Sequence, residues 1–162
     1  HEDISKVVEP ESLLCLINRR EFLKEDQLIL SEKLCERLSR SIPIAFSSDP
    51  PKREHNLNDH IESILNDNRV QYQREFPGLN FALAKTVPDH KHVDLLIEAK
   101  YIRGKTTPSV ASDGISADIT KYDPHSFILF VVYDPERSIR VDETFCSDLE
   151  SRRSNCKVCI IR

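Results

Sequence analysis

The stretch that decides the fold is VDLLIEAKYIR, residues 93–103, where apolar side chains alternate with charged ones. In an extended strand, every second side chain lies on the same face of the sheet. One face of this strand would then be wholly apolar and suited to a hydrophobic core. The other face would carry two carboxylates and one ammonium group, from Asp94, Glu98 and Lys100.

Charged side chains on so apolar a strand are costly to bury unless they are paired or bind a metal ion. Leu96 lies among the charges, and the apolar Tyr101 and Ile102 follow them. This pattern favours a central strand whose charged end opens into a cleft. The alternative is a strand at a solvent-exposed edge of the sheet.

The segments around this strand predict an α/β fold. Residues 127–133 (FILFVVY) are continuously apolar, as expected of a strand that is covered on both faces. Further strands are predicted at 81–87 and 157–161, with a turn at 88–91 before the decisive strand. Helical periodicity marks 11–17, 26–38, 57–67, 113–122 and 142–152. This order predicts a central mixed sheet with helices on both sides.

The composition limits the classes of function. The chain has 162 residues, 39% of them hydrophobic, which fits one domain with a sizeable core. Three scattered glycines exclude a glycine-rich phosphate loop. No apolar run approaches the length of about 18 residues that a membrane span requires. Cys156 and Cys159 form a C-x-x-C pair, but zinc needs a second ligand pair, and we discard it.

The cysteines and the first residue bear on the origin of the chain. Five cysteines in apolar contexts predict buried thiols in a reducing compartment, and we expect a cytoplasmic protein with no membrane partner. There is no Met anywhere, even at position 1. We therefore expect a domain cut from a longer protein, whose other domains are partners.

The charged face of the strand suggests a metal-dependent hydrolase. Mg²⁺ prefers oxygen ligands and commonly takes one or two carboxylates together with a substrate phosphate. Asp94 and Glu98 offer such a pair, and the carbonyl group of Ala99 could add a third oxygen. Lys100 would stand beside the ion, where it could orient or help deprotonate a water and offset charge on a phosphate. These groups suit the hydrolysis of a phosphodiester.

The run Pro88-Asp89, Asp94 and Glu98-Ala99-Lys100 resembles the PD-(D/E)XK motif of the restriction-endonuclease-like nucleases. The resemblance implies that the two acids bind Mg²⁺, with Mn²⁺ as a possible substitute, and that the lysine serves the nucleophilic water. It covers roughly residues 57–161 and implies a three-layer core with a central mixed sheet. We expect the nuclease core to span 55–162, after an N-terminal helical extension at 1–48.

The same resemblance assigns residues on neighbouring elements. Such nucleases often take a further acid from an upstream helix, a place that Glu62 matches. The helix around residues 118–122 (DITKY) and the strand that ends in Tyr133-Asp134-Pro135 resemble a restriction-type branch found in bacterial genome defence. Apart from the resemblance, the local basic residues Arg103 and Lys105 after the strand are expected to contact nucleic acid, as is Lys121, although a solvated loop would also explain the first two.

The first metal ligand remains open between two acids. Asp94 and Glu98 are four residues apart, which separates their Cα atoms by about 13 Å on a straight strand. One ion cannot easily bridge that gap. Either the strand is bent, or another acid takes the place of Asp94. Asp89 is the literal acid of the Pro-Asp pair, but it lies in a predicted turn, and we favour Asp94.

The predicted function is therefore a Mg²⁺-dependent endonuclease domain that cleaves DNA rather than RNA, in restriction or antiviral defence. A homo-oligomer is possible for such a domain. One alternative is a catalytically inactive nuclease-fold module that binds nucleic acid or protein. A third interpretation is a structural domain in which Glu98-Ala99-Lys100 occurs by chance.

Overall fold

The computed structural model describes residues 10–66, 72–74, 79–81 and 84–162. In chain order the elements are α1 (Pro10–Ala45), α2 (Glu54–Leu65), β1 (Gln73–Arg74), β2 (Leu79–Phe81), β3 (Ala84–Thr86), β4 (His90–His92), β5 (Leu95–Tyr101), α3 (Pro108–Lys121), β6 (Phe127–Tyr133), α4 (Asp142–Glu150) and β7 (Cys156–Ile161). No helix within these ranges combines the length and apolarity needed to cross a membrane.

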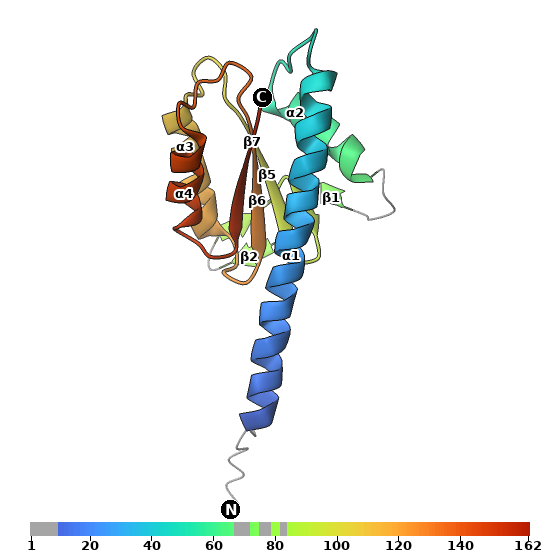
Figure 1. Ribbon diagram of the computed structural model, residues 1–162, viewed down its shortest axis with the longest axis vertical. Helices are drawn as coiled ribbons and strands as arrows, with labels where there is room; N and C mark the ends of the chain where they lie inside the picture. The colour runs from blue at the N-terminus through green and yellow to red at the C-terminus, as the bar shows by residue number, and fades with distance from the viewer. Residues whose placement is uncertain (1–9, 67–71, 75–78, 82–83) are drawn as a thin grey trace, which may run out of the picture.

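The centre of the fold is a five-stranded mixed sheet in the order β1-β4-β5-β6-β7. β4 and β5 form an antiparallel hairpin, whereas β5, β6 and β7 run parallel. Helices cover both faces, as Figure 1 shows, and the predicted α/β architecture is confirmed. β2 and β3 form a separate antiparallel pair.

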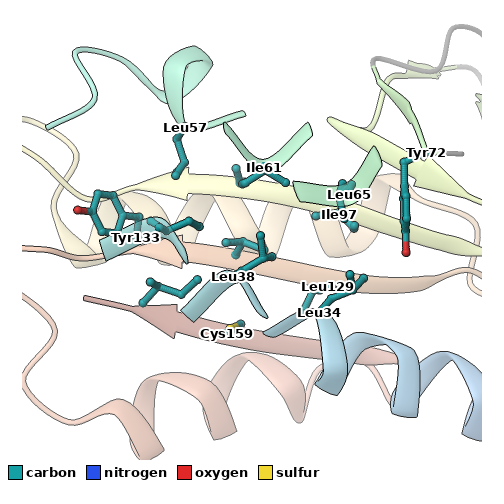
Figure 2. Close-up of a cluster of buried hydrophobic side chains, with 14 of the residues drawn as sticks. Leu34, Leu38, Leu57, Ile61, Leu65, Tyr72, Ile97, Leu129, Tyr133 and Cys159 are labelled. Carbon is teal, nitrogen blue, oxygen red and sulfur yellow. The ribbon is translucent and has the colours of Figure 1, made fainter. Parts of the chain in front are cut away.

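One face of the sheet is covered by α1 and α2. Leu34, Leu38 and Ile42 from α1 are almost fully buried against Ile97 and Leu129 of the sheet. Figure 2 shows the α1 and α2 side chains meeting over β5, β6 and β7. Each such side chain contributes roughly 1.5–3 kcal/mol on burial. The second half of α1 is thus part of the main core, while its first half extends away from the sheet (Figure 1). The domain division at 48 and 55 stays a prediction.

The opposite face is covered by α3 and α4. Its core contains Leu96, Ile128, Phe130 and Val158 from the strands and Ile115 from α3. The alternation predicted for the decisive strand is therefore present from Leu95 onward. Odd-numbered residues face α1 and α2, and Leu96 faces α3 with Glu98 and Lys100.

β7 is an outer strand, and side chains of α4 cover the middle of its free edge. The N–H group of Val158 donates to Glu150 Oε1 at 2.8 Å, and its carbonyl oxygen accepts from Cys146 Sγ at 3.6 Å. Main-chain groups that would otherwise be open on this edge are therefore bonded within the domain.

Several predicted elements differ from the structure. The helices predicted at 11–17 and 26–38 are one continuous helix, α1, which accommodates Pro43 near its carboxyl end. Because only two residues of α1 follow Pro43, the proline ring disturbs little of the helix. α3 begins at Pro108 rather than 113, because Thr107 accepts the Val110 N–H and proline suits the first helical turn. The strand predicted at 81–87 is β3 with the end of β2; residues 82–83 lie outside the described residues.

The most consequential difference lies before β5. The predicted turn at 88–91 is instead partly strand: β4 spans His90–His92, and the turn is at Val93 and Asp94. Val93 has φ of 52°, a left-handed conformation that β-branched residues rarely adopt. A valine gives no turn signal, so the sequence pattern extended the strand through this position.

Candidate active site

The candidate site is built where β5 extends past β4. β4 begins at His90, which pairs with Ile97, so among the residues that the structure describes no strand pairs with β5 beyond Ile97 on that side. Two carboxylates take its place. Asp89 Oδ2 accepts the Ala99 N–H at 2.8 Å, and Glu54 Oε2 accepts the Tyr101 N–H at 3.2 Å. Main-chain hydrogen bonding thus brings two acids to the edge of the decisive strand.

Glu98 and Lys100 lie on the face of β5 that α3 covers. Glu98 is only 5% exposed, and its Oε1 accepts a hydrogen bond from the Tyr122 hydroxyl. Lys100 Nζ lies 2.8 Å from Asp118 Oδ2, and Lys121 Nζ lies 2.8 Å from the other oxygen of the same carboxylate. α3 and the residue directly after it therefore provide one partner each for Lys100 and Glu98.

The electrostatics of this site are dominated by burial and an excess of carboxylates. Burial raises the pKa of Glu98 to about 8, and the charge of Asp89 adds to the effect. The Tyr122 hydrogen bond and the charge of Lys100 offset this only in part. Burial also raises the pKa of Glu54, although Lys100 and the Tyr101 N–H oppose it.

Lys100 and Tyr122 stay protonated for different reasons. Burial alone would lower the pKa of Lys100, but the ion pair with Asp118 and the charge of Glu98 outweigh it, and the pKa is raised. Burial and the neighbouring charge of Glu98 raise the pKa of Tyr122 far above its usual range. Lys100 is therefore a cation at neutral pH, and Tyr122 is a hydrogen-bond donor.

The donor set fits a hard divalent cation. Asp89 and Glu98 repel each other strongly enough to affect the Glu98 pKa, and a cation beside both carboxylates would remove that repulsion. Within the described part of the chain, no group of three His, Cys, Asp or Glu side chains is arranged as a metal site. A pair of carboxylates is nevertheless what Mg²⁺ commonly uses, because it keeps several waters.

Of the residues predicted for the metal, the structure brings Glu98, the main chain of Ala99 and Lys100 together, but not Asp94. Asp94 is exposed in the turn before β5, where its carbonyl oxygen accepts the Phe127 N–H at 2.8 Å. It is separated from Glu98 by about 13 Å of extended strand. Our preference for Asp94 over Asp89 is therefore reversed: Asp89 is the acid beside Glu98.

Glu62 is also away from the site. It forms an ion pair with Arg74 at 2.8 Å, and Arg74 also contacts Asp59, so Glu62 joins α2 to β1. Glu54 lies eight residues earlier, about 12 Å along the same helix. The helix predicted at 57–67 began too late to include Glu54. An acid at this point of the sequence is typical of the first turn of a helix, but it gives no sign of the contact between Glu54 and Tyr101.

The predicted nucleic-acid contacts are divided. Lys105 is exposed in the loop after β5. Arg103 shares that loop, but its Nη1 donates to the Pro51 carbonyl oxygen at 3.1 Å and joins the loop to the segment before α2. Lys121 is held by Asp118 at the site itself. Asp118 and Tyr122, which the sequence analysis places in the helix around residues 118–122, contact Lys100 and Glu98 respectively.

Searches of curated proteins and of solved structures found no match to the chain. A protein-family model, REase_DpnII-MboI, matches residues 89–162. It describes a family of type II restriction endonucleases, which implies a DNA substrate. The matched segment begins at Asp89 and contains Glu98, Lys100, Asp118 and Tyr122. In this segment the chain is similar to type II restriction endonucleases, consistent with a restriction-endonuclease-like PD-(D/E)XK nuclease, and the similarity supports a DNA endonuclease of restriction defence.

Proposed function

We propose that the chain is a divalent-metal-dependent endonuclease domain that hydrolyses phosphodiester bonds of DNA in genome defence. One observation carries the proposal: Asp89 and Glu98 meet beside Lys100 at the end of β5 that β4 leaves uncovered. Two carboxylates suffice to hold a hard cation that also binds a phosphate, and the ammonium group adds a positive charge beside it.

In this proposal Asp89 and Glu98 hold Mg²⁺, with the Ala99 main chain and Glu54 at the border of the site. When bound, the ion would act as a Lewis acid toward the phosphate and lower the pKa of a bound water. Glu98 must lose its proton for this role. Because the pKa of Glu98 is raised to about 8, the metal competes with a proton at neutral pH.

Lys100 is proposed to act as a fixed cation rather than as a base. The ion pair with Asp118 keeps the Lys100 ammonium group protonated and holds it in one position. A fixed positive charge stabilises the negative charge that builds on a phosphate during attack. Asp118 is then a positioning residue for Lys100, and Tyr122 is one for Glu98.

The test is a cleavage assay of the purified chain with supercoiled plasmid, linear duplex, single-stranded DNA and RNA. Each substrate is incubated with Mg²⁺, Mn²⁺ or EDTA. We expect cleavage of DNA with either ion, none in EDTA, and none of RNA. A chain that cleaves in EDTA, or cleaves none of these substrates with either ion, contradicts the proposal.

One observation favours the inactive-module alternative. Lys100 and Glu98 are each already engaged within the protein, by Asp118 and Tyr122. Calorimetric titration with Mg²⁺ or Mn²⁺ separates the two functions. An active site should bind the ion saturably and release protons from Glu98, whereas an inactive module should show no saturable binding.

A further inference from the structure

An open pocket of about 560 Å³ lies at the carboxyl ends of β6 and β7, outside the catalytic cluster of Asp89, Glu98 and Lys100. It is lined by Arg137 and Arg140 from the loop after β6, by Arg162 after β7, and by the first turn of α4. With Asp142 and Glu143 on that turn, the pocket lining has three positive and two negative side chains. Its balance is positive, in a chain whose net charge is −4.

The pocket and the catalytic cluster both lie at the carboxyl ends of the parallel strands. β5, β6 and β7 are parallel, with Lys100 opposite Val132 and Tyr133 opposite Ile161. The loops that follow β5 and β6 therefore emerge at the same end, as Figure 1 shows. Since neighbouring strands are about 4.8 Å apart, the pocket lies on the order of 10 Å from β5. A DNA strand bound at Lys100 has further phosphates at this range.

The arginines at this end of the sheet differ in whether they are already paired within the protein. Arg162 is paired with Asp142, its Nη1 lying 2.5 Å from Oδ2, and Arg103 donates to the Pro51 carbonyl oxygen. Arg137 and Arg140 are exposed, and neither guanidinium has a hydrogen bond or a direct ion pair within the described ranges, although the charge of Arg137 helps to lower the pKa of Asp142. Two guanidinium groups are thus available to an anionic ligand in a pocket that Arg162 and Asp142 hold in shape.

The loop that presents them is held in place. The carboxylate of Asp134 accepts the N–H groups of Ser138 and Ile139 at 2.8 and 2.9 Å, and the Arg137 N–H donates to the Asp134 carbonyl oxygen. Arg137 has φ of 54°, in the left-handed region that favours glycine. Such strained non-glycine residues cluster at sites that bind ligands. The loop is ordered before any ligand arrives, which lowers the entropy cost of binding.

We propose that this pocket binds a backbone phosphate of DNA that flanks the cleaved one, through Arg137 and Arg140. The inference rests on the proposed function and adds to it a second phosphate site at the same end of the parallel strands. Guanidinium groups bind phosphate in paired hydrogen bonds, and such contacts fix the register of a protein on the duplex. The site would hold the substrate without taking part in bond cleavage.

The test compares R137G/R140A with a control, K24A/K33A. Glycine suits the left-handed φ of residue 137, so that change deletes the guanidinium without straining the loop. Lys24 and Lys33 are exposed on α1. Lys33 lies 12 residues, about 18 Å, before the end of that helix. Both variants lose two positive charges. Binding of a short duplex is measured in EDTA at several salt concentrations, and cleavage at saturating plasmid is measured with Mg²⁺.

For R137G/R140A we expect about tenfold weaker binding. The salt dependence of log K should become shallower by about 0.9 for each phosphate that the variant no longer neutralises. The rate at saturating plasmid should be unchanged, and the control should bind like wild type. Unchanged affinity and slope in R137G/R140A, or an equal weakening in the control, overturn the inference while wild-type cleavage stands. A wild-type chain that cuts no DNA overturns the proposed function instead.

Discussion

The two ends of β5 hold an acid each, in opposite environments. Asp94 precedes the strand in an exposed hairpin turn, where β4 covers the neighbouring main chain. Asp89 lies beside the other end, where β4 stops and the Ala99 N–H donates to its carboxylate. Asp94 is therefore exposed to solvent at one end, whereas Asp89 lies next to Glu98 at the other. An aspartate thus belongs to this site only if it lies where the pairing between β4 and β5 ends.

The largest expected effect separates these two acids. Asp89→Asn should slow cleavage of plasmid by about 10³-fold, because it removes one of two charged oxygen ligands at the site. Asp94→Asn should cleave within about twofold of wild type. Single-turnover cleavage with Mg²⁺ measures both variants. An equal slowing in the two would mean that the ends of β5 do not differ in function.

A somewhat smaller effect tests the cation at the uncovered end. Lys100→Ala should reduce cleavage by about 10²-fold, because it removes the fixed charge that faces the phosphate. Lys121→Ala is the matched control: it removes an ion pair to the same Asp118, but its side chain is 52% exposed. We expect less than a tenfold change there. A fully active Lys100→Ala protein with a native circular dichroism spectrum would refute the assignment.

The buried carboxylate also makes stability depend on pH. The folded pKa of Glu98, about 8, exceeds the ordinary value of 4.5 that holds in the unfolded chain, so the folded chain holds more protons between these values. Stability should therefore fall as pH rises through that window. The decrease is about 2 kcal/mol between pH 6 and pH 7.5.

Urea unfolding in EDTA at the two pH values measures this decrease. Glu98→Gln should lack the dependence, because it cannot ionise, and Asp94→Asn should retain it. At the higher pH, Mg²⁺ should restore the stability that the wild-type protein has lost. It should not stabilise the Glu98→Gln variant. A wild-type stability that rises across this window would contradict the prediction.

The smallest effect concerns the hairpin turn at the other end of β5. Val93 is exposed and has a positive φ. Val93→Gly should stabilise the fold by about 1 kcal/mol, since glycine adopts that backbone conformation without steric cost. Thermal unfolding measures the change, and cleavage should be unaffected. A destabilised Val93→Gly protein would show that the turn is not strained.

Local periodicity in the sequence predicts some elements of this fold and leaves others unmarked. The continuous apolar run indicates β6 at Phe127–Tyr133, and alternation identifies which side chains of β5 share a face. β4, in contrast, has the sequence His-Lys-His and is followed by a valine in a left-handed conformation, so neither composition nor turn chemistry marks the hairpin. The sequence pattern therefore places Asp89 in a turn at 88–91, away from any strand.

Glu54 was missed for a related reason. It reaches the site through a hydrogen bond to Tyr101, a residue 47 positions away, and nothing local to residue 54 indicates that contact. Glu62 has the same charge on the same helix and a better apolar context, but the helix directs it to Arg74. Distinguishing the two acids requires knowing where α2 begins relative to the end of β5.

The covered edge of β7 limits how this domain can assemble. Glu150 and Cys146 occupy the outward main-chain groups of Val158, so an incoming strand would have to displace an internal carboxylate to bond there. Continuation of the sheet into another polypeptide is thereby disfavoured at the middle of this strand. At this point of β7, association between copies would have to use side-chain surfaces instead of main-chain pairing.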